Sequence, residues 1–131
     1  MSVDSARTLA LDIAERLQAI GDVGVRRFFG GLALLIDGVQ IGFVMKGSLY
    51  LRVDDMSRPA FEALGALPFT YAGGGRSVTV ARYYEAPADI LDDPERLRDF
   101  AKNAYRAALA DAIDPARKKR DRHQGRPNRG R

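Results

Sequence analysis

The stretch RFFGGLALLIDGVQIGFVMKGSLYLRVD, residues 27–54, carries the clearest fold signal in the chain. Two dipeptides, Asp37-Gly38 and Lys46-Gly47, interrupt its apolar runs. Such pairs favour the two-residue turns of β-hairpins, because both central residues of a type I′ turn have positive φ. The pattern therefore predicts three antiparallel strands, at residues 27–36, 39–46 and 48–53.

Alternating apolar residues indicate which face of these strands packs on the core. The expected inward residues are Leu32, Leu34, Ile36, Ile41, Phe43, Leu49, Leu51 and Val53, with Ile41 and Phe43 sharing one face. The opposite face is less polar than a solvent-facing surface usually is, with Tyr50 and the stem of Arg52 upon it. We therefore treat that opposite face as a candidate partner surface.

The rest of the chain predicts further helices and strands. A helix is expected over residues 5–20, a connector over 22–26, a short helix over 55–64 and strands at 68–71 and 77–84. Asp93-Pro94 predicts the start of a long helix that ends near Ile113, since Asp caps helices and Pro suits their first turn. The predicted fold class is α+β in two layers, with an antiparallel sheet of about five strands and helices on one face, in the order α-β-β-β-α-β-β-α.

The chain resembles the TfoX N-terminal domain family, which is named for a regulator of bacterial competence. The resemblance rests on Phe29-Gly30-Gly31, Asp37-Gly38, Leu49-Tyr50-Leu51-Arg52, Phe61, Pro68-Phe69-Thr70-Tyr71, Tyr83-Tyr84, Pro87 and Asp92-Asp93. It covers residues 12–112 and implies the same α+β layout and a regulatory association. The strand 39–44 departs from the family pattern, and the longer regulators carry a second, C-terminal domain.

Charge is distributed unevenly along the 131 residues. Residues 115–131 contain eight basic and one acidic residue, while residues 1–114 contain 13 basic and 16 acidic ones. We expect a domain at 1–114 and a disordered basic tail at 115–131, because the tail has too few apolar residues to form a core. The tail residues expected to contact a polyanion are Arg117, Lys118, Lys119, Arg120, Arg122, Arg126, Arg129 and Arg131.

The residue inventory argues against several kinds of chemistry. The chain has no cysteine, and His123 is its single histidine, so no zinc or copper site, catalytic triad or cofactor site is expected. Helix capping explains the acidic pair Asp92-Asp93, and a strand end that leads to a helix explains Asp54-Asp55. Gly73-Gly74-Gly75 lacks the spacing of a phosphate-binding loop and is interpreted as a hairpin turn. The polar N-terminus and the lack of a long apolar run predict a cytoplasmic protein without membrane contact.

These observations predict a small non-catalytic regulatory protein that binds a protein partner or a second copy of itself. The residues expected on its recognition surface are Arg26, Arg27, Tyr50, Arg52 and Tyr84. Two alternative functions stay open, nucleic-acid binding and catalysis. The basic tail favours non-specific contact with DNA or RNA, and strand-borne tyrosines beside arginines are also found where sheets stack single-stranded bases. The second alternative is an enzyme of unrecognised type, with a pocket near Arg27, Tyr71 or Arg82.

Overall fold

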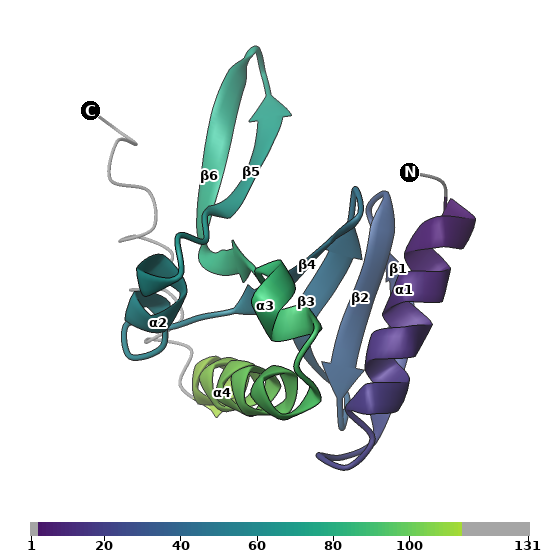
Figure 1. Cartoon of the computed structure of the whole chain (residues 1–131). Coiled ribbons are helices and arrows are strands. Elements are labelled where there is room, and N and C mark those ends of the chain that lie inside the picture. Colours follow the sequence, from purple (N-terminus) through teal and green to yellow (C-terminus); the bar gives the residue numbers. More distant parts are fainter. Residues whose placement is uncertain (1–2, 114–131) are drawn as a thin grey trace.

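A computed structural model describes residues 3–113, which form four helices and six strands (Figure 1). In chain order they are α1 (Val3–Arg16), β1 (Val23–Phe28), β2 (Gly31–Ile36), β3 (Val39–Met45), β4 (Ser48–Arg52), α2 (Arg58–Ala63), β5 (Pro68–Gly73), β6 (Arg76–Glu85), α3 (Ala88–Leu91) and α4 (Pro94–Ile113). The predicted tail at 115–131 lies outside the described residues.

All six strands belong to one antiparallel sheet, in the order β1-β2-β3-β4-β6-β5, and the predicted α+β class is confirmed. The sheet has one strand more than the five predicted. The supposed connector before residue 27 is part of β1, and Phe29-Gly30 forms the turn to β2. The sequence pattern does not predict β1, because Gly24, Arg26 and Arg27 interrupt the alternation of apolar and polar residues.

The turns follow the local sequence chemistry. Asp37 and Gly38 have φ of 50° and 83°, and Lys46 and Gly47 have φ of 53° and 83°, as expected of hairpin turns. Gly74 and Gly75 also have positive φ and join β5 to β6, so the glycine-rich segment is a hairpin turn. The resulting β5–β6 hairpin, residues 68–85, projects beyond the rest of the sheet and is called the arm below (Figure 1).

A β-bulge in β3 changes which residues face the core. Ala33 pairs with Phe43 and Leu35 pairs with Gln40, so Ile41 is an extra residue between these pairs. Ile41 joins the core cluster, while Phe43 points to the opposite face beside Ala33. The prediction that Ile41 and Phe43 share a face is therefore wrong, because the bulge shifts the alternation by one residue.

The core lies between one face of the sheet and helices α1, α2, α3 and α4. Ile13 and Leu17 come from α1 or the turn after it, and Ile90 comes from α3. Helix α4 contributes Leu97, Ala101 and Ala104 to the same cluster. The strands approach one another closely at Gly42, where a Cβ would overlap the carbonyl oxygen of Tyr50. The opposite face of the sheet carries the features described next.

Candidate functional site: an aromatic groove beside the arm

The strand register gathers aromatic side chains on the face opposite the core, called the aromatic face. Phe43 lies between Ala33 on β2 and Tyr50 on β4. Tyr50 pairs with Glu85 on β6, and Arg52 pairs with Tyr83. Side chains at directly paired positions point to the same side of a sheet. Residues from four neighbouring strands, β2, β3, β4 and β6, therefore share this face.

Phe43 is the centre of the aromatic face. Its ring centroid lies 5.0 Å from those of Phe28, Phe69 and Tyr83, and 5.2 Å from that of Tyr50. Contacts of this geometry contribute about 0.5–1.5 kcal/mol each beyond burial. The cluster links β1, β3, β4 and both strands of the arm, so it also holds the arm against the sheet.

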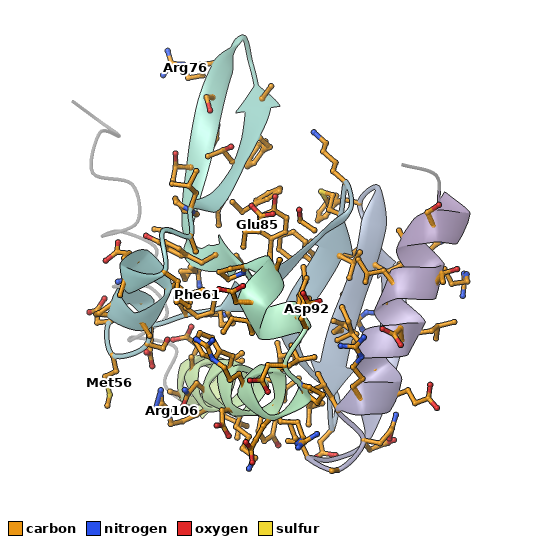
Figure 2. The ribbon with its side chains drawn as sticks, in the orientation of Figure 1. Met56, Phe61, Arg76, Glu85, Asp92 and Arg106 are labelled. Atoms are coloured by element: carbon orange, nitrogen blue, oxygen red, sulfur yellow. The ribbon has the colours of Figure 1, made fainter. Side chains whose placement is uncertain are left out.

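A groove of about 430 Å³ opens where the arm meets the ends of β1 and β3. Its lining is apolar: Phe28, Phe29, Phe43, Met45, Phe69, Tyr71, Val80 and Tyr83. Figure 2 shows side chains filling the angle between the arm and the neighbouring strands, with Glu85 at the base of the arm and Arg76 at its tip. A volume of this size accommodates several side chains of a partner or one small ligand.

Phe29 is the most exposed aromatic residue of the groove. It is 86% exposed, and its φ of 46° lies in the left-handed region that bulky residues rarely occupy. Such a conformation costs about 1–3 kcal/mol, and its one aromatic contact is with Phe28 at 4.9 Å. The fold does not need a phenylalanine here, because glycine or asparagine suits this backbone better. The exposed ring is therefore a candidate contact residue.

Polar groups occur at the edge of the aromatic face. Ser48 Oγ donates a hydrogen bond of 2.6 Å to Glu85 Oε2. Burial and the neighbouring Glu85 carboxylate raise the pKa of Tyr50, which keeps its phenol neutral at ordinary pH. Tyr50 is half-buried in this position.

Of the residues expected on the recognition surface, Arg26 and Arg27 are exposed on β1. Arg26 pairs with Ala33 and so faces the aromatic side, two residues before Phe28. Arg27 pairs with Leu32, on the core-facing side, and lines a smaller hollow next to Phe28 and Phe29. The two arginines therefore flank the same end of β1 from opposite sides.

Arg52 is buried rather than displayed on the surface. Its exposed fraction is 7%, and its Nη2 pairs with Oδ2 of the equally buried Asp111 on α4. Arg82 Nη1 lies 3.9 Å from the same carboxylate oxygen, and the Arg52 guanidinium lies 5.8 Å from the centre of the Tyr83 ring. This arrangement gives Arg52 a structural role in joining β4 to α4.

The adjacent tyrosines on β6 point to opposite sides of the sheet, as their spacing predicts. Tyr84 is 5% exposed in the core, and its hydroxyl donates a 2.9 Å hydrogen bond to Glu62 Oε2. Burial, together with this carboxylate, raises the pKa of Tyr84. Tyr83 lines the groove instead, so Tyr83 replaces Tyr84 in the candidate surface.

Each acidic pair supplies a carboxylate that accepts backbone hydrogen bonds near a helix start, from Asp54 in the turn before α2 and from Asp93 at the start of α4. The backbone N–H groups of Met56 and Ser57 each donate a 3.0 Å hydrogen bond to Asp54 Oδ1. Burial alone would raise the pKa of Asp54, but the hydrogen bonds from Ser57 and Met56 and the nearby Arg106 lower it overall. Asp93 Oδ1 accepts from Glu95 N–H at 3.1 Å at the start of α4.

Metal-binding groups and membrane-spanning helices are both absent from residues 3–113. In residues 3–113, no group of three or more histidine, cysteine or acidic side chains is arranged to hold a metal ion. No helix in this part of the chain has the length and apolar character needed to cross a membrane. The eight basic tail residues and His123 lie beyond the described residues.

Sequence reasoning missed four phenylalanines of the groove: Phe28, Phe29, Phe43 and Phe69. One signal was available, because Phe29 sits at a turn position that favours small polar residues. The other three are ordinary strand residues, and only long-range pairing brings them together.

Comparison with known proteins gives two findings. The model of the TfoX N-terminal domain family matches residues 15–108 of this chain. Protein Sxy of Escherichia coli (strain K12) is 30% identical over 114 residues, which is 87% of this chain and 53% of Sxy. The chain therefore spans about half the length of this relative.

Proposed function

This chain belongs to the TfoX N-terminal domain family, and from that premise we propose that it is a non-catalytic, competence-regulator-like protein of the cytoplasm that acts by binding another protein. The groove beside the arm is the proposed docking site. Its members are Phe28, Phe29, Phe43, Met45, Phe69, Tyr71, Val80 and Tyr83, with Arg26, Arg27 and Tyr50 at its margin.

The observation that carries this proposal is the exposure of apolar surface at a defined hollow. Phe29 and Tyr71 are 86% and 46% exposed on opposite sides of the groove. Burying such rings against a partner removes apolar area from water at about 25 cal/mol per Å². Aromatic residues in pockets are also the residues that most often dominate binding energy in protein interfaces.

The proposal is tested by affinity purification with full-length protein, followed by direct binding measurements on each purified candidate. The groove variant combines Phe29→Gly with Tyr71→Thr, which removes two exposed rings and leaves the backbone preferences satisfied. The control variant is Met56→Thr, because Met56 is 75% exposed and lies near α2, away from the groove (Figure 2).

We expect the groove variant to lose partners that the wild type and Met56→Thr retain, with Kd raised at least about tenfold for two lost aromatic anchors. A groove variant that binds every purified partner as tightly as the wild type contradicts the assignment of the docking site. Circular dichroism of both variants checks that the fold is unchanged.

A second candidate function rests on the charge of the tail. Eight basic residues and one acidic residue within positions 115–131 favour non-specific contact with DNA or RNA. Binding of a fluorescent oligonucleotide is measured at low and moderate salt, with full-length protein and with residues 115–131 deleted. We expect the deletion to remove most of the salt-sensitive affinity. Equal binding by both proteins rules this function out.

A further inference from the structure

Three exposed cations lie on the elements that border the groove, and one carboxylate, that of Glu85, lies at the base of the arm. Arg26 lies on the aromatic side of β1, Lys46 follows the groove residue Met45, and Arg76 lies at the tip of the arm (Figure 2). All three are exposed, and none takes part in the ion pairs found among residues 3–113. The groove therefore has a basic margin, and none of its three cations is neutralised by these ion pairs.

Three other basic side chains near the sheet behave differently. Arg52 and Arg82 pair with Asp111, and Arg58 pairs with Asp55 at 2.8 Å. Glu85, an acidic residue on the aromatic face, accepts a hydrogen bond from Ser48. The cations of the margin thus stand apart from the structural ion pairs of the domain.

This charge pattern bears on which segment can occupy the groove. The basic tail of the same chain is a poor occupant, because it repeats the charge of the margin and its apolar side chains are only those of Pro115, Ala116 and Pro127. A single-stranded nucleic acid matches the charge, but the groove lining offers few polar groups for base edges. An acidic segment with aromatic or aliphatic side chains matches both the charge and the lining.

We propose that the groove takes an acidic peptide segment of a partner protein, with apolar anchors that enter between the arm and β1 and carboxylates that meet Arg26, Lys46 and Arg76. This inference rests on the proposed function and specifies the chemistry of its partner. Opposite charges at the margin of an interface mainly accelerate association and reject partners of the wrong charge, while the buried anchors hold the complex.

The test uses fluorescein-labelled 12-residue peptides and full-length protein. One set alternates Asp or Glu with Phe, Tyr or Leu, and a matched set has Lys in place of every acid. We expect the acidic set to bind by fluorescence anisotropy and the basic set to bind at least about tenfold more weakly, because charge reversal changes attraction to repulsion. Raising the salt concentration should weaken the acidic set severalfold, since exposed charges are screened.

Charge reversal on the protein locates the effect. The double variant Arg26→Glu/Lys46→Glu should weaken binding of the acidic set by roughly tenfold and improve binding of the basic set. The control is Lys102→Glu, an exposed position on α4 outside the groove, which should change affinity less than about twofold.

Three outcomes overturn the inference: equal affinity of both peptide sets, no binding of either set, or equal effects of Arg26→Glu/Lys46→Glu and Lys102→Glu. An oligothymidine probe that displaces the acidic peptides also overturns it, as does loss of peptide binding under conditions where light scattering shows that the chain has dimerised. The proposed function fails separately, when Phe29→Gly/Tyr71→Thr leaves binding of an identified partner unchanged.

Discussion

Replacing Asp111 with asparagine tests whether Arg52 is structural or available to a partner. Asp111 is 5% exposed and is the counter-charge of the buried Arg52, with Arg82 3.9 Å from the same oxygen. The substitution keeps the size of the side chain and removes its charge. Arg52 is then left in the interior without a compensating carboxylate.

The expected loss of stability follows from these positions. Breaking a buried ion pair by removing one partner costs about 3–5 kcal/mol. Asp111 also lies in the last turn of α4, where a negative charge is unfavourable, so neutralisation returns about 0.3–1 kcal/mol. The net loss is about 2–4 kcal/mol, a large share of the roughly 5–15 kcal/mol by which domains are stable.

Urea unfolding followed by circular dichroism at pH 7 measures this loss as a lower midpoint at unchanged slope. The control is Asp99→Asn, which makes the same chemical change at an exposed position of α4 and should cost less than about 0.5 kcal/mol. Replacing both partners, with Arg52→Met and Asp111→Leu, should restore most of the stability. Equal effects of Asp111→Asn and Asp99→Asn refute the structural role and return Arg52 to the candidate surface.

Three further predictions concern the close backbone approach at Gly42, the carboxylate of Asp54 and the exposed ring of Phe29. Gly42→Ala should destabilise the domain by at least about 2 kcal/mol, since the new methyl group overlaps the Tyr50 carbonyl oxygen; urea unfolding measures it, and an unchanged midpoint argues against the close approach. Asp54 has a lowered pKa in the folded domain, so its charge stabilises fully above the unfolded value of about 3.9, and this contribution is lost as pH falls through the lower folded pKa. The stability advantage of the wild type over Asp54→Asn should therefore shrink as the pH falls below about 4, and a constant difference contradicts the charge effect. Phe29→Gly should change stability by less than about 1 kcal/mol, because relief of positive-φ strain offsets the lost contact with Phe28; a larger loss in thermal unfolding means that the ring serves the fold.

Local chemistry accounts for the features that the sequence predicts well. Asp37-Gly38 and Lys46-Gly47 form the expected turns, and α4 begins at Pro94 after its Asp93 cap. In each case the deciding interaction is a backbone conformation or a hydrogen bond within a few residues. The neighbouring residues therefore suffice to predict the element, wherever it lies in the fold.

Long-range pairing accounts for the features that the sequence does not predict. The bulge at Ile41 depends on how β3 pairs with β2, and it moves Phe43 to the aromatic face. Similarly, the burial of Arg52 depends on Asp111, which is remote in the sequence and contributed by α4.

The chain's residue types and order are thus enough to indicate the α+β class, the hairpins and the family, because turns, caps and alternation are local signals. The groove is a property of the folded sheet. Phe28, Phe43 and Phe69 meet there because the register and the projection of the arm bring β1, β3 and β5 together. Which of two adjacent tyrosines reaches the surface is settled in the same way, by the direction that each side chain takes from β6.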